Sequence, residues 1–160
     1  MKLAEKGRFQ PPPVLTGPFA QTVSEAVAAW PDVHARTHWL LGDEQKVDGA
    51  DFYVGEEELG HIHLYAEAHV LQQLPLAEAL VEAKLALPFR WSRNVVVFGI
   101  NALPDIDHAL WLFRLNYDYL KGTPVSDLLA RVRGYSEARA AGKKPLPSPS
   151  KGPTRRAREA

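Results

Sequence analysis

The chain has 160 residues and no cysteine, and its 19 basic residues balance its 19 acidic residues. A chain of this length predicts one domain with a substantial core. The missing cysteine excludes disulfides, thiol catalysis and thiolate metal sites. The balanced charge provides no overall field that would recruit nucleic acid or a membrane surface. Because the sequence shows neither a secretory signal nor a run of roughly 18 apolar residues, we expect a soluble cytoplasmic protein.

Composition divides the chain into three predicted regions. Residues 1–15 contain Pro11-Pro12-Pro13 and predict an extended arm. Residues 16–141 carry the apolar patterns of a folded domain. Residues 142–160 are basic and proline-rich, which predicts a disordered, solubilising tail. The alternatives are a proline-rich ligand for a partner in the arm and weak contact of the tail with nucleic acid.

Four helices are expected from apolar residues at helical spacing. Proline suits the first turn of a helix, and Pro18, Pro75 and Pro104 stand at three of the expected starts. The third of these helices is the most apolar and should end at Gly122. For the fourth, Thr123 is the expected cap and Pro124 the expected first position.

The strands are expected between these helices. Residues 33–41, 51–54 and 56–69 read as antiparallel strands, with residues 42–49 as a charged loop bounded by two turns. Residues 95–100 are continuously apolar and predict an interior strand. The predicted class is therefore α+β, in the order α-β-β-β-α-β-α-α, with a small, mainly antiparallel sheet and helices packed on one side.

The stretch from Glu56 to His69 separates into two faces if it forms a strand, because side chains alternate with period two. The apolar face carries Ile62, Leu64, Ala66 and Ala68. The other face carries side chains that hydrogen-bond or titrate, namely His61, His63, Tyr65, Glu67 and His69. Chemistry is therefore expected on this second face.

His61 and His63 are the main candidates for that chemistry. Their Cα atoms should lie about 6.6 Å apart on one strand face, so both imidazoles could converge on one metal ion or one substrate atom. A third metal ligand would come from Glu58, Glu67, His69 or another element, and Glu58 could instead orient an imidazole. The alternatives are a histidine pair that bonds buried polar groups, or a metal-free acid–base pair with a pKa suited to neutral pH.

Other polar residues in apolar surroundings are weaker candidates. His34, His38 and His108 are scattered and are expected to be surface histidines or hydrogen-bonded core histidines. Arg114 lies in the apolar third helix and needs a carboxylate or carbonyl groups if it is buried. Tyr117, one turn later, could share that network.

The tryptophans and the absent motifs limit the remaining possibilities. Trp39, Trp91 and Trp111 either line an apolar pocket for an aromatic ligand or belong to the core. The sequence has no glycine-rich phosphate loop, no Gly-x-Ser-x-Gly turn and no paired-carboxylate pattern. Phosphoryl transfer and serine hydrolysis therefore have no support.

Residues 30–120 resemble the luciferase-like domain family (the DUF5519 group). The likeness is carried by a succession of motifs: Trp30-Pro31-Asp32-Val33, Asp51-Phe52-Tyr53-Val54-Gly55, Glu58-Leu59-Gly60-His61-Ile62-His63, Leu74-Pro75-Leu76 and Leu112-Phe113-Arg114-Leu115-Asn116-Tyr117. The block from Glu58 to His63 is the most specific of them. The sequence departs from the family at Leu87-Pro88-Phe89-Arg90, where many relatives carry a further histidine.

The resemblance implies an α+β domain and, from the family's bioluminescent members, an oxygenase that adds molecular oxygen to a hydroxypyrone without a metal or flavin. By this likeness His61 and His63 face the substrate, supported by Glu58, and one of the two histidines ionises the enol. We therefore expect no cofactor and a small planar aromatic or enolic ligand. The residues expected to bind this ligand are Tyr65, Trp91, Arg114 and Tyr117.

Two alternatives from other functional classes stay open. One is a metal-dependent enzyme with His61 and His63 as ligands. The other is a non-enzymatic interaction module in which the arm and the tail bind partners.

Overall fold

The computed structural model describes residues 8–142, so most of the predicted tail and the first half of the predicted arm lie outside the described residues. The described residues form four helices and a six-stranded sheet in the order α-β-β-β-β-α-β-β-α-α. Every strand pair is antiparallel. The predicted α+β class with a small antiparallel sheet is confirmed, and two strands join those that the sequence predicts.

The sheet has the spatial order β1-β2-β3-β4-β6-β5. Its strands are β1 (Val33–Leu40), β2 (Asp43–Val54), β3 (Glu57–His63), β4 (Glu67–Leu71), β5 (Leu87–Phe89) and β6 (Ser92–Gly99). The helices are α1 (Pro18–Ala28), α2 (Leu74–Glu82), α3 (Leu103–Leu120) and α4 (Val125–Ala140). A proline occupies one of the first two positions of α1, α2 and α3, as predicted.

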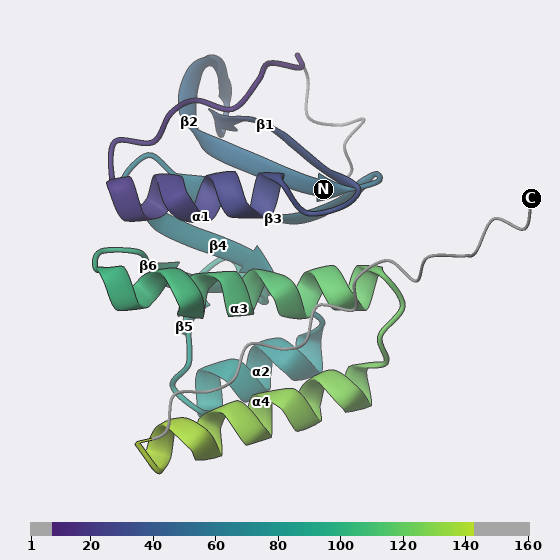
Figure 1. Cartoon of the computed structure of the whole chain (residues 1–160). Helices are drawn as coiled ribbons and strands as arrows, with labels where there is room; N and C mark the ends of the chain where they lie inside the picture. The colour runs from purple at the N-terminus through teal and green to yellow at the C-terminus, as the bar shows by residue number, and fades with distance from the viewer. Residues whose placement is uncertain (1–7, 143–160) are drawn as a thin grey trace, which may run out of the picture.

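The helices α1 and α3 lie side by side against one face of the sheet, and α2 and α4 lie beyond β5 and β6 (Figure 1). The core between α1, α3 and the sheet contains large side chains that are completely buried, among them Phe52, Leu59, Ile62, Leu112 and Phe113. Among the described residues, no helix is both long and apolar enough to cross a membrane. Because α1 and α3 pack against one face of the sheet, they leave the other face of the central strands uncovered.

The predicted single strand from residue 56 to residue 69 is wrong, because the structure forms a hairpin there. The chain turns after His63, where the Ala66 N–H donates to the His63 carbonyl at 3.0 Å and Ala66 has a φ of 65°. β3 and β4 then pair with His61 opposite His69. Since directly paired residues share a face of a sheet, the turn keeps the histidines on one side.

The predicted charged loop over residues 42–49 is also wrong, since β2 begins at Asp43 and continues through this region. Gly49 lies inside the strand with a φ of +154°. A Cβ atom at Gly49 would lie 1.9 Å from the Ile62 carbonyl oxygen on β3. Glycine here permits a close approach of two backbones and does not mark a turn.

The described part of the arm runs along the outer edge of β1. The Thr37 N–H donates to the Gln10 carbonyl at 2.7 Å, and the Thr37 hydroxyl donates to the Pro11 carbonyl at 2.6 Å. The Arg8 carbonyl accepts hydrogen bonds from the side chains of Arg36 and Trp39. β1 is an edge strand that pairs only with β2, and these bonds occupy donors along its other side.

Candidate functional site

Four histidines gather on the sheet face that lies away from α1 and α3, and we call His38, His61, His63 and His69 the histidine cluster. The strand register brings them together, because His61 lies opposite His69 on β4 and opposite Asp51 on β2. His38 and His63 lie on either side of Gly49. The rings of His38 and His61 stack with centroids 4.1 Å apart, and those of His63 and His69 lie 4.4 Å apart.

Each histidine of the cluster is paired with its own carboxylate. The four pairs are His38 Nδ1–Asp51 Oδ1 at 2.7 Å, His61 Nδ1–Glu58 Oε1 at 3.1 Å, His63 Nδ1–Asp48 Oδ2 at 2.9 Å and His69 Nε2–Glu67 Oε1 at 2.8 Å. A carboxylate that accepts from one ring nitrogen fixes the proton there. The second nitrogen of a neutral ring then keeps its lone pair for a ligand.

Glu58 reaches this face through an irregularity in β3. In a regular strand, residues three apart point to opposite faces, so Glu58 and His61 would be separated by the sheet. The register instead pairs Phe52 with Gly60 and Tyr53 with Glu58, which leaves Leu59 as an extra residue. This β-bulge places Leu59 in the core and turns Glu58 toward His61.

The cluster is shielded from solvent, and burial favours the neutral form of His61 and His63. The exposed fractions of the four side chains lie between 8% and 14%. Burial lowers the pKa of His61 against the opposing effect of Glu58. Burial and, to a smaller extent, the neighbouring His61 and His69 lower the pKa of His63 to about 4. Both rings are therefore neutral near pH 7.

One completely buried nitrogen of the cluster has no hydrogen-bond partner among the described residues. This atom is His63 Nε2, which is completely buried. Buried polar atoms are nearly always satisfied, so an exception at a cluster of titratable groups points to a missing ligand.

Three of the histidines are close enough to converge on one metal ion. One ligand atom on each of His38, His61 and His63 lies within 4.8 Å of the others. A second group with the same spacing combines Asp51, Glu58 and His61. The sequence predicted two of the three imidazoles and left the third ligand open.

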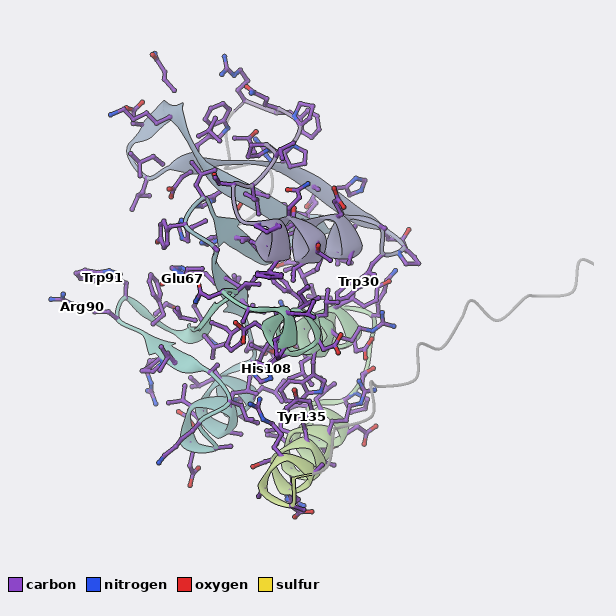
Figure 2. The ribbon with its side chains drawn as sticks, turned by 60° about the vertical axis from the view of Figure 1, so that its left-hand side comes forward. Trp30, Glu67, Arg90, Trp91, His108 and Tyr135 are labelled. Atoms are coloured by element: carbon purple, nitrogen blue, oxygen red, sulfur yellow. The ribbon has the colours of Figure 1, made fainter. Side chains whose placement is uncertain are left out.

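Aromatic side chains border the cluster. The Tyr65 ring stacks on His63 with centroids 4.9 Å apart, and Phe89 lies 4.8 Å from His69. Figure 2 shows Glu67, Arg90 and Trp91 on the side of the sheet away from α1 and α3, with Trp91 on the turn that joins β5 and β6. Phe89 also lines a pocket of about 310 Å³ between α2 and this hairpin.

Two of the predicted ligand-binding residues lie elsewhere. Arg114 and Tyr117 belong to α3, on the other side of the sheet from the cluster, and both contact Trp30. The Arg114 guanidinium pairs with Asp118 at 3.1 Å, and the Tyr117 hydroxyl donates to the Pro31 carbonyl at 2.9 Å. The structure therefore brings Tyr65 to the histidines but not Arg114 or Tyr117. The exposed Trp91 ring contacts Arg90 and is not among the ring contacts of the cluster.

Sequence reasoning missed three members of the site: His38, Asp48 and Asp51. It expected His38 to be a surface or satisfied core histidine and Asp48 to be part of a turn. The available signal was the alternation of His34, Arg36 and His38 on one face of the first strand, which places polar groups on the same face as the central histidines.

The comparisons with known proteins agree with the motif resemblance. A family model described as the Luciferase domain matches residues 56–116. The matched segment begins in the turn before β3 and ends in α3, and it contains Glu58, His61, His63 and His69. No curated protein and no solved structure matches the chain. The match confirms the predicted likeness to luciferase-like domains.

Proposed function

We propose that this luciferase-like domain binds a small planar enolic or aromatic molecule over the histidine cluster and exchanges a proton with it. The observation that carries the proposal is the set of four imidazoles, each paired with its own carboxylate, on one solvent-poor face. Ordinary surface histidines lack both the shielding and the carboxylate partners.

This arrangement suits the ionisation of an enol. A neutral imidazole accepts a proton, and its carboxylate partner stabilises the imidazolium that forms. His61 and His63 are held neutral by burial, so they are in the accepting form near pH 7. An enolate formed in a solvent-poor site is electron-rich, and addition of molecular oxygen to it is the reaction that the family resemblance implies.

The surroundings of the cluster suit a flat ligand. Tyr65 and Phe89 present aromatic rings beside His63 and His69. Such rings stack on a planar molecule and exclude water from it. The neighbouring pocket of about 310 Å³ shares Phe89 and is within the size range of small-molecule sites.

Binding of 4-hydroxy-6-methyl-2-pyrone, a planar enolic probe, tests the proposal. The dissociation constant is measured by NMR titration for the full chain, for the double variant His61→Gln/His63→Gln and for His34→Gln. His34 is an exposed histidine on β1 and provides the matched control. We expect the double variant to bind at least tenfold more weakly than the wild type and His34→Gln to bind equally well.

Circular dichroism checks that the double variant retains the fold. Equal affinity in the folded double variant contradicts the proposal, as does the absence of pyrone binding by the wild-type chain at millimolar concentration.

A further inference from the structure

We propose that the histidine cluster is also a metal centre, in which His38, His61 and His63 hold one divalent first-row transition ion through neutral imidazole nitrogens. The inference goes beyond the proposed function, which requires no ion. A ring nitrogen that holds an ion cannot accept a proton from an enol, so His61 and His63 serve one role at a time, and each role is tested separately. It rests on the convergence of the three rings, on their carboxylate partners and on the unsatisfied nitrogen of His63.

The three rings come from different positions in the sheet and meet at one place. His38 lies on β1, while His61 and His63 lie two residues apart on β3. The His38 and His61 rings are nearly parallel, at 8°, and His63 is nearly perpendicular to both, at 89° and 86°. His63 is therefore set edge-on to a pair of stacked rings. Because an imidazole lone pair lies in the ring plane, His38 and His61 must turn relative to each other before both can bind one ion.

The spacing is close to that of a metal-bound set. Imidazole nitrogens bound to one ion at about 2.1 Å stand about 3.4 Å apart in a tetrahedral arrangement. Ligand atoms of the three histidines lie within 4.8 Å of one another. Binding of one ion would therefore require the rings to turn about their side-chain bonds and bring these atoms closer together.

The hydrogen bonds of the three imidazole rings are those typical of metal-binding histidines. Each of the three rings directs Nδ1 to a carboxylate, which leaves the lone pair on Nε2, and the Nε2 of His38 also lies 3.7 Å from Asp48 Oδ2. Metal-bound histidines commonly use such outer carboxylates to fix the ring orientation. The buried Nε2 of His63 has no hydrogen-bond partner in the described chain, and a metal ion would satisfy it.

The charges around the site compensate a divalent ion. Asp48, Asp51 and Glu58 stand behind the three imidazoles, while Arg36 lies opposite Asp51 in the sheet register. Buried charge needs nearby opposite charge, and three carboxylates against one guanidinium leave a net negative environment. Asp51 and Glu58 also appear in the mixed group with His61, but each already holds a histidine in place, so we assign them to the outer shell.

His69 stands beside this centre and supplies an internal control. It is buried, as His63 is, and it contacts His61 and His63, but it belongs to neither ligand group. It bonds Glu67 through Nε2, whereas the three proposed ligands bond their carboxylates through Nδ1. The inference therefore distinguishes His69 from its neighbours in metal binding.

The ligand set indicates the class of ion. Neutral imidazoles suit iron, cobalt, nickel, copper and zinc, whereas magnesium and calcium prefer oxygen ligands. Three protein ligands leave at least one position for water or for an oxygen atom of a bound molecule.

Cobalt and zinc titrations of the full chain test the inference. The protein is produced without a polyhistidine tag and stripped with a chelator. Co²⁺ binding is followed by visible absorption, and bound Zn²⁺ is counted by elemental analysis after dialysis. We expect one ion per chain, with His38→Gln, His61→Gln and His63→Gln each weakening Co²⁺ binding at least 100-fold. We expect His34→Gln and His69→Gln to stay within about threefold of the wild type, and Asp48→Asn to weaken binding about 10- to 100-fold.

Three results overturn the inference: no stoichiometric Co²⁺ or Zn²⁺ in the wild type, equal affinity in His63→Gln and His34→Gln, or a loss in His69→Gln as large as in His63→Gln. If His61→Gln fails to fold, His38→Gln on the edge strand tests the same centre. Pyrone binding measured in the presence of chelator keeps the two proposals apart. Metal binding without pyrone binding contradicts only the proposed function, and pyrone binding without metal binding contradicts only the metal centre.

Discussion

The structure contains a second environment for a buried histidine, and it contrasts with the histidine cluster. His108 lies between α3 and α4, close to Tyr135 (Figure 2). Its Nε2 donates to the Leu85 carbonyl at 2.6 Å, and its Nδ1 accepts from the Tyr135 hydroxyl at 2.8 Å and from Arg139 at 2.9 Å. Both nitrogens of His108 are therefore satisfied within the chain.

The cluster differs in the partners of its rings and in what they leave free. Its four rings pair with carboxylates, whereas His108 pairs with a carbonyl, a hydroxyl and a guanidinium. His63 also keeps a buried nitrogen without a hydrogen-bond partner among the described residues. A fully bonded histidine fixes two elements together, and a histidine with one free nitrogen is ready for a ligand. Burial alone does not separate these two roles, but hydrogen bonding does.

The largest expected effect on stability comes from a substitution in β2, the strand that lies between His38 and His63. This substitution should also disrupt the histidine cluster. Gly49→Ala should lower the free energy of unfolding by about 3 kcal/mol or more, because the new Cβ would meet the Ile62 carbonyl oxygen in a strained conformation. Urea denaturation measures the change. Gly42→Ala is the matched control, since Gly42 also has a positive φ but faces open space, and it should cost about 1 kcal/mol. Equal losses in the two variants would show that crowding between β2 and β3 is unimportant.

A smaller loss of stability is expected when His108, whose two ring nitrogens are both hydrogen-bonded, is replaced. His108→Leu leaves the Leu85 carbonyl, the Tyr135 hydroxyl and Arg139 without their shared partner. Unsatisfied buried groups cost about 1–3 kcal/mol, so the variant should lose about 2–3 kcal/mol of unfolding free energy in urea. Tyr135→Phe, which removes only one of these hydrogen bonds, should lose about 1 kcal/mol. A loss below 0.5 kcal/mol for His108→Leu, roughly the scatter of surface substitutions, would contradict a structural role.

The pH dependence of stability should follow the buried histidines. Burial lowers the pKa of His108 below its usual value near 6.5, against the opposing effect of the Leu85 hydrogen bond. The unfolded chain then takes up protons before the folded chain does, so the free energy of unfolding should fall as the pH falls below about 6.5. The fall should be smaller in His108→Leu than in the wild type, as measured by urea denaturation between pH 7 and pH 5. If the free energy of unfolding fell equally with pH in the wild type and in the variant, His108 would have the same pKa in the folded and unfolded chains.

The smallest effect is expected at the unsatisfied histidine. His63→Leu removes a buried nitrogen that has no hydrogen-bond partner in the described chain, and the Asp48 side chain that loses its imidazole is partly exposed. In the absence of metal, the variant should therefore stay within about 1 kcal/mol of the wild type in urea. A loss as large as that of His108→Leu would place His63 with the structural histidines.

Local patterns predicted the class of fold and the chemical face. Pro18, Pro75 and Pro104 stand at helix starts as predicted, since proline constrains its own residue regardless of distant contacts. His61 and His63 share a face because strand periodicity is local. Even the misread hairpin left His61 and His69 on one side, since strand pairing places them opposite each other.

The remaining parts of the site depend on long-range pairing, which no local pattern reveals. His38 and Asp48 reach His63 only through the register of three strands. Asp48-Gly49 has the composition of a turn, but the space that Gly49 leaves is used for contact with β3. Glu58 joins His61 through a bulge that strict alternation would have excluded.

The arm along β1 has a consequence for solubility. Exposed edge strands can recruit strands from other molecules and begin aggregation. At one end of this sheet the arm takes the Thr37 N–H, and at the other β5 is three residues long and contains Pro88, which has no N–H to donate. Both features reduce the number of free main-chain donors at the margins of the sheet, which disfavours intermolecular growth.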